Sequence, residues 1–129
     1  MIQRHKIKIP IFERDVWILL GDRDDVSDYL SDINMAPFEI KSKWDGVCFD
    51  YLGNGYIWFD IKYISVPIIV HELGHATFDL MLDFGLEITD QEAFCYIQQY
   101  LMKECCDIFA IQMDLTCLAS TQEDEVQSS

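Results

Sequence analysis

The sequence has little positive charge and no long apolar run, and both absences limit what it can bind. It contains nine Lys and Arg residues against 23 Asp and Glu residues, which gives a net charge of −14. Because phosphate groups are bound by clustered cations, we expect no nucleic-acid partner and no membrane partner. No apolar run approaches the roughly 20 residues of a membrane-spanning helix. The acidic charge is compatible with a basic peptide or protein partner, although such charge often only maintains solubility.

The cysteines are too irregular in number and spacing to form a disulfide framework. Their count is odd and no C-x-x-C pair occurs, which also excludes a cysteine-built zinc knuckle. Thiols in this number are typical of a reducing compartment. The N-terminal segment lacks the apolar stretch of a signal peptide. We therefore expect a cytoplasmic protein.

Short apolar runs predict the strands of a sheet. Residues 6–9 alternate Lys and Ile, and residues 15–20 contain an apolar run, so both are expected to be strands of one hairpin. A second and stronger hairpin signal comes from the β-rich runs 46–52 and 56–64. These two runs flank the turn sequence Gly53-Asn54-Gly55.

Three segments have the sequence signals of helices. The spacing of apolar residues predicts a first helix over 24–35. Ser65, followed by a proline two residues later, is typical of a helix start, and Gly85 is typical of a helix end, so a second helix is expected between them. A third helix is expected over 89–111, with Thr89 as its cap.

Length and composition fit one domain. Half of the 129 residues are hydrophobic, which is enough for a core without disulfide bonds. We place this domain at residues 1–119 and expect the acidic segment 120–129 to be a disordered tail. The order of strands, helix, hairpin and two helices predicts the α+β class, with a mixed or antiparallel sheet.

The second predicted helix contains an H-E-x-x-H motif, His71-Glu72-Leu73-Gly74-His75. One helical turn separates His71 from His75, so both imidazoles leave the same face and can bind one metal ion. Glu72 lies about 100° round the helix from His71 and is suited to reach a metal-bound water. Zinc lowers the pKa of such a water from about 16 to about 7, and a carboxylate can accept its proton. The motif therefore predicts Zn²⁺ on the two histidines, with Glu72 as the catalytic base.

A catalytic zinc ion usually has a third protein ligand, for which the next predicted helix offers two candidates. The first candidate is Glu92, although Thr89-x-x-Glu92 also has the form of a capping box. The second is Asp90, which lies under the apolar face of that helix, where a short carboxylate needs a partner. The spacing leaves both carboxylates open as ligands.

Two segments carry a resemblance to a known family. The segment Ile69–Ala76, with sequence Ile-Val-His-Glu-Leu-Gly-His-Ala, resembles the active-site helix of the zincin metallopeptidases. The glutamate in Asp90-Gln-Glu-Ala93 is similar to the ligand glutamate of the gluzincin branch and its single-domain miniature members. The same segments are similar to small uncharacterised proteins encoded by phages. The resemblance covers residues 56–104, and Tyr96 departs from it, because gluzincins commonly have an acidic residue there.

The resemblance implies a small zincin-like domain with an active-site helix followed by a long helix. It implies a zinc-dependent metallopeptidase in which Zn²⁺ is bound by His71, His75 and Glu92. It also implies a peptide or protein substrate that pairs with an edge strand at residues 56–63. A rival arrangement is that of peptide deformylase, where a cysteine, here Cys48, is the third ligand, but the surrounding residues do not resemble that family's cysteine motif.

A catalytically silent role is the alternative to hydrolysis. In that case a zincin-like metal-binding domain would act as an interaction protein, encoded by a phage and directed at a host protein. Hydrolysis requires the Glu72 carboxylate, whereas a structural metal site requires only the ligands. Neither hypothesis defines the substrate or the oligomeric state.

Overall fold

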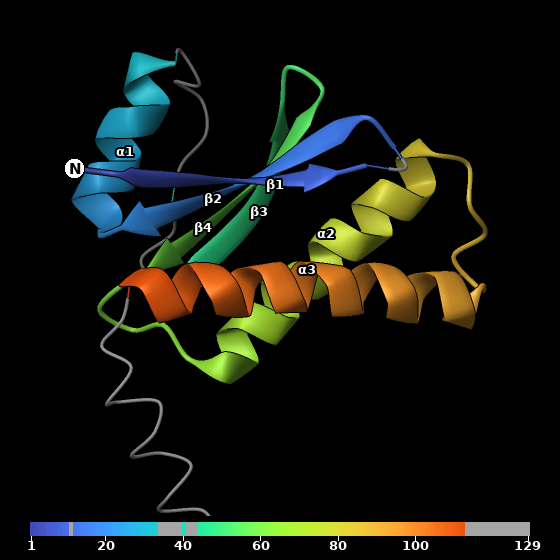
Figure 1. The fold of residues 1–129 in the computed structure, drawn as a ribbon. Helices are drawn as coiled ribbons and strands as arrows, with labels where there is room; N and C mark the ends of the chain where they lie inside the picture. The colour runs from blue at the N-terminus through green and yellow to red at the C-terminus, as the bar shows by residue number, and fades with distance from the viewer. Residues whose placement is uncertain (11, 34–39, 41–43, 113–129) are drawn as a thin grey trace, which may run out of the picture.

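The computed structural model describes residues 1–10, 12–33, 40 and 44–112. The expected tail at 120–129 and the end of the domain at residue 119 lie outside the described residues. Within them the chain forms β1 (Gln3–Ile9), β2 (Arg14–Gly21), α1 (Arg23–Asp32), β3 (Gly46–Tyr51), β4 (Asn54–Asp60), α2 (Val66–Asp83) and α3 (Gln91–Gln112), as Figure 1 shows. The α+β class and the order of elements confirm the sequence prediction. Among the described helices, none combines the length and the apolar character needed to cross a membrane.

The four strands form one mixed sheet in the order β1-β2-β4-β3. Both predicted hairpins are confirmed, since β1 pairs with β2 and β3 pairs with β4 in antiparallel fashion. The two hairpins are joined by a parallel pairing of β2 with β4, in which Ile18 lies opposite Ile57. A parallel pair needs a crossover connection, and here α1 and β3 lie between the two strands in sequence.

The second hairpin turns earlier than predicted. Its turn residues are Leu52 and Gly53, with φ of 50° and 82°, as a two-residue hairpin turn of this kind requires. The observed register pairs Phe49 with Tyr56, and their rings stack at 5.3 Å. A turn over residues 53–55 would instead place Phe49 opposite Phe59, which packs on the other face of the sheet. Side-chain pairing therefore overrides the turn preference of the Asn-Gly sequence.

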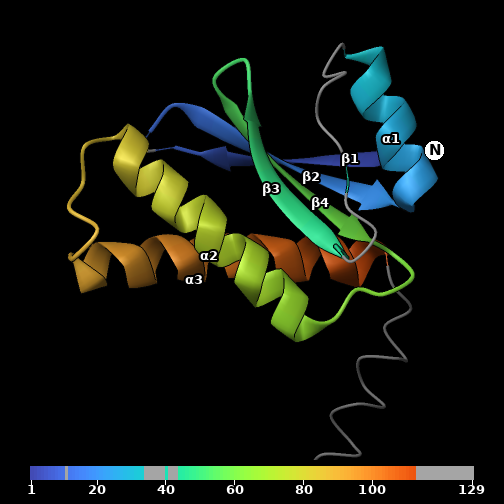
Figure 2. The same cartoon turned by 180° about the vertical axis from the view of Figure 1, so that it is seen from behind.

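Helices cover both faces of the sheet (Figures 1 and 2). On one face α1 packs Val26 and Leu30 against Trp58, and the Trp58 indole donates a hydrogen bond to the Gly21 carbonyl at 3.1 Å. On the other face α2 and α3 cover a larger core that includes Phe59. The two central strands are thus buried on both faces, which explains their nearly continuous apolar sequences.

The edge strand beside α2 is β3 rather than β4. The prediction that residues 56–63 form the edge strand is wrong, because β4 pairs with β2 on one side and with β3 on the other. The burial of residues 56–60 gives the physical reason, since a strand that is buried throughout belongs in the middle of a sheet. Along β3, by contrast, only Phe49 is buried. The backbone of β3 therefore lies at the rim of the sheet, next to the H-E-x-x-H helix.

Candidate metal centre

Helix α2 begins and ends at the residues that its sequence predicts. Ser65 is the N-cap, its hydroxyl accepts a hydrogen bond from the Ile68 amide at 3.5 Å, and Pro67 lies in the first turn. Gly85 follows the helix with φ of 70°, the left-handed conformation that is common after a helix end. The two caps place the H-E-x-x-H sequence in the middle of an intact helix.

His71 and His75 direct the same ring atom to one point in space. Their Nε2 atoms are 3.2 Å apart, and the ring planes are inclined by 81°. Two nitrogen ligands of a tetrahedral zinc ion, each at about 2.05 Å, lie about 3.3 Å from one another. The pair therefore fits two positions on one ion. Without an ion, the same distance corresponds to a hydrogen bond between the two rings.

Glu72 lies beneath the histidines and is buried, with 7% of its surface exposed. Within the described part of the chain, its carboxylate makes no hydrogen bond or ion pair. Burial raises the pKa of Glu72, and the two histidines act in the opposite direction. Burial makes the charged form of Glu72 costly, and its side chain lines an open hollow that a water molecule beside the histidines can enter.

This cost leads to a prediction for the metal-free protein. We expect Glu72→Gln to raise the free energy of unfolding at pH 7 by about 1 kcal/mol, because it removes a buried charge that lacks a partner. Burial raises the folded-state pKa, so the carboxylate destabilises the fold only above the unfolded-state pKa of about 4.3, and increasingly as pH rises through the folded-state value. Urea unfolding at pH 4 and pH 7 should show the gain at pH 7 alone. An equal gain at both pH values would contradict this origin.

An open hollow of about 350 Å³ lies beside Glu72 and His71. Its walls come from the start of β3 and from the first turns of α2. They include Trp44, Asp45, Gly46, Pro67 and Ile68. Both histidines are exposed, so a substrate can approach the pair and Glu72 from this side.

Gly46 allows β3 to approach Glu72 closely. A Cβ atom at Gly46 would lie 3.1 Å from the Trp58 carbonyl oxygen and 3.2 Å from Glu72 Cγ. Both distances are shorter than ordinary contacts, and the carbonyl belongs to a central strand that cannot move freely. No local pattern in the sequence indicates this role, because the close approach exists only once β3 and β4 are paired beside α2.

Comparison with known proteins identifies no relative. No protein-family model matches the chain, and no curated protein or solved structure matches it. We therefore infer function from the geometry of α2, β3 and α3.

The structure does not bring a third ligand to the histidine pair. Among the described residues, no group of three His, Cys, Asp or Glu side chains is arranged to hold a metal ion. Glu92 is exposed in the first turn of α3 and makes no hydrogen bond or ion pair within the described part of the chain. The structure places His71, Glu72 and His75 on one helix, and the assignment of Glu92 as the third ligand stays a prediction.

Helix α3 is capped by Asp90, which contradicts the alternative in which Thr89 and Glu92 form a capping box. The Asp90 carboxylate accepts a hydrogen bond from the Ala93 amide at 3.0 Å, and the helix begins at Gln91. Asp is among the strongest N-cap residues, and here it competes successfully with the neighbouring Thr. This hydrogen bond gives the Asp90 carboxylate a partner, so the residue needs no metal ion to satisfy it. Glu92, by contrast, has no capping role that would occupy its side chain.

Cys48 faces α2 from the edge strand but does not join the histidines. Its sulfur lies 3.8 Å from an Asp79 carboxylate oxygen, one helical turn beyond His75. Burial, together with the nearby Asp79 and Glu72 carboxylates, raises the pKa of the Cys48 thiol far above its usual value. A metal ligand must be a thiolate, so this environment does not favour the peptide deformylase arrangement.

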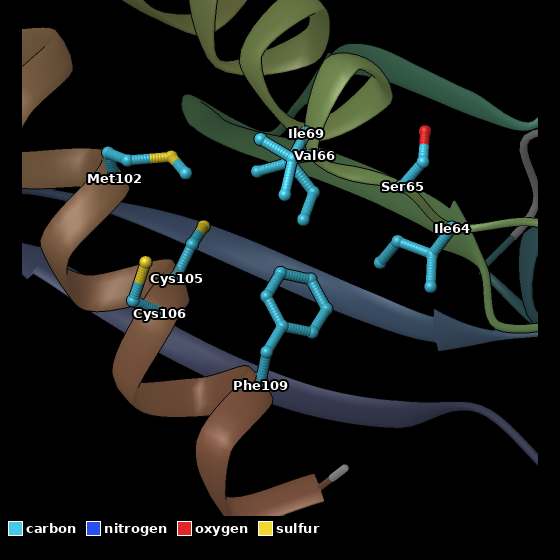
Figure 3. A pocket seen from close by; sticks show the side chains of 8 residues that line it. All are labelled: Ile64, Ser65, Val66, Ile69, Met102, Cys105, Cys106 and Phe109. Carbon is cyan, nitrogen blue, oxygen red and sulfur yellow. The ribbon is translucent and has the colours of Figure 1, made fainter. Parts of the chain in front are cut away.

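A second hollow, of about 190 Å³, lies where the start of α2 meets the end of α3 (Figure 3). Two of its lining residues are Cys105 and Cys106. The side chains around them are apolar apart from the Ser65 hydroxyl. Burial raises the pKa of the Cys105 thiol to about 12, so this sulfur is protonated at neutral pH and is not a nucleophile. Among the described residues, no His, Asp or Glu that could serve as a base lines this hollow.

Proposed function

We propose that this protein is a zinc-dependent peptidase that hydrolyses an amide bond in a peptide or protein. Zn²⁺ is bound by His71 and His75, with Glu92 as the third ligand, and Glu72 is the general base. One observation carries the proposal: two imidazole Nε2 atoms lie 3.2 Å apart on the turn of helix that also holds the buried Glu72. The resemblance of residues 69–76 to the zincin helix supports it. The cytoplasm remains the expected compartment, because an odd number of irregularly spaced cysteines is typical of a reducing environment.

The chain's own residues supply orientation and proton transfer. A zinc ion held by His71 and His75 would supply Lewis-acid chemistry at this point. Glu72 would accept a proton from an attacking water molecule and later deliver a proton to the leaving amine. Burial raises the pKa of Glu72. A raised pKa suits a carboxyl group that must first accept a proton and then donate it.

The edge strand offers a way to hold the substrate. Within the described part of the chain, the backbone of β3 is paired with β4 on one side only, and an extended peptide can pair with the other side. Gly46 at the start of β3 lies close to Glu72, since a Cβ atom there would be 3.2 Å from Glu72 Cγ. A peptide paired along β3 would therefore pass beside the base and the two histidines.

The incomplete ligand set favours a second candidate function. Because the described residues hold no group of three metal ligands, the chain is also suited to a silent role. In that role the zincin-like domain binds a metal weakly or not at all and acts by binding another protein. The two candidates differ in metal content and in the need for Glu72.

Metal content per chain tests the proposal. We expect about one zinc ion per chain in protein purified without chelator or nickel resin, and none after replacement of both His71 and His75 by Ala. The matched control is His5→Ala, which removes the remaining histidine, on β1, and should leave the zinc content unchanged. Elemental analysis gives the answer. Protein that holds no metal and takes up no added zinc at neutral pH would exclude the peptidase and leave the interaction protein.

A further inference from the structure

The face that carries the histidines is built from segments without any cation of their own. No Lys or Arg occurs between Lys62 and Lys103. This stretch contains the whole of α2 and the first half of α3. It also contains six carboxylates, which are Glu72, Asp79, Asp83, Glu87, Asp90 and Glu92.

Two arginines from other elements reach this face, and each is shared between carboxylates. Arg14 of β2 pairs with Asp50 of β3 at 3.0 Å and also with Asp83 of α2. Arg23 of α1 pairs with Asp45 at 3.2 Å and lies 3.9 Å from a second carboxylate. Two guanidinium groups thus serve four carboxylates. Among the residues that the structure describes, carboxylates of α2 and α3 remain without a cation after these ion pairs are formed.

The hollow beside Glu72 has the two parts that a Lys or Arg side chain needs. Pro67 and Ile68 provide apolar surface for an alkyl stem, and Trp44 provides an aromatic wall that suits both the stem and a cation. Asp45 provides a carboxylate in the same wall. Glu72 lines the hollow as well and is more than nine-tenths buried, and its carboxylate makes no hydrogen bond among the described residues. The negative charge of these carboxylates favours a cation in the hollow.

We propose that the site binds a basic peptide segment, with one Lys or Arg side chain in the hollow between Trp44, Asp45 and Ile68. Cleavage of that segment rests on the proposed peptidase function, whereas its binding requires neither metal nor turnover. Negative charge around the histidines also attracts a basic segment over a distance and repels an acidic one. The substrate class is therefore cationic polypeptide.

Binding to metal-free wild-type protein tests the charge preference first. Two fluorescent peptides of equal length, one with Lys and Arg and one with Glu at the same positions, are compared by anisotropy at near-physiological salt. We expect the basic peptide to bind at least about tenfold more tightly. Equal affinity for the two peptides would overturn the proposal.

Two substitutions that each remove one negative charge test whether the basic peptide binds at the hollow. Asp45→Asn should weaken binding of the basic peptide about three- to tenfold, because it removes a carboxylate of the hollow and releases Arg23. Asp28→Asn, on the exposed side of α1, should change it less than about twofold. Equal weakening by both variants would show attraction by net charge alone and would overturn the site.

Hydrolysis by zinc-loaded protein separates this inference from the proposed function. Quenched fluorescent versions of the two peptides are offered at equal concentration. A basic peptide that binds at the hollow but is never cut supports the binding site and contradicts the peptidase. Cleavage of both peptides at the same rate supports the peptidase and overturns the basic specificity.

Discussion

Glu72→Gln is expected to abolish hydrolysis while zinc remains bound. The amide has the shape of the carboxylate but cannot accept the proton of the attacking water, so kcat should fall by about 10²–10⁴-fold. Zinc content should stay at that of the wild type, because Glu72 points about 100° round the helix from His71 and is not one of the two converging ligands. The measurement pairs cleavage of a quenched fluorescent peptide library with elemental analysis of the same samples.

Glu87→Gln is the matched control for this variant. Glu87 is exposed in the connection between α2 and α3, so its replacement also removes one carboxylate but should leave kcat unchanged. Undiminished hydrolysis by Glu72→Gln would mean that another group accepts the proton, or that the activity does not come from this site. Loss of zinc from Glu72→Gln would mean that the carboxylate is a ligand rather than a base.

The part of the site that follows from helical geometry could be predicted from the sequence. Ser65 and Gly85 mark the ends of α2, and the spacing of His71 and His75 places their rings on one face. All of these features depend on residues within a few helical turns. The α+β class followed in the same way from local patterns, which reported each strand and helix separately.

The part that depends on pairing between distant segments could not be predicted. The parallel pairing of β2 with β4 moves β4 to the centre of the sheet and leaves β3 at the rim. The close approach of Gly46 to Glu72, and the hollow that Trp44 shares with Ile68, follow from that arrangement. No local pattern in the sequence encodes these contacts. The predicted cap residue of α3 was wrong for a different reason. Thr89 and Asp90 are both good N-cap residues, and only the fold decides between them.

Glu92→Ala is expected to weaken zinc binding strongly if Glu92 is the third ligand. Loss of one of three protein ligands should lower the affinity at least about 100-fold, more than the loss of an outer partner of a ligand usually does. Competition with a chromophoric chelator measures this affinity. Asp90→Ala is the matched control, because it removes a carboxylate two residues away that already caps α3.

The two variants should separate metal binding from helix stability. Asp90→Ala should cost about 1 kcal/mol of unfolding free energy through loss of the cap, with zinc affinity nearly unchanged. Glu92→Ala should leave the metal-free stability nearly unchanged, since its carboxylate has no partner in the described structure.

Glu92 does not join the histidines in this structure, so ligation requires the first turn of α3 or the Glu92 side chain to move toward them. Zinc binding can drive such a movement, because an ion that binds only the closed arrangement shifts the population toward it. Unchanged zinc affinity in Glu92→Ala would leave the ion with two protein ligands, which favours the silent interaction protein over the peptidase.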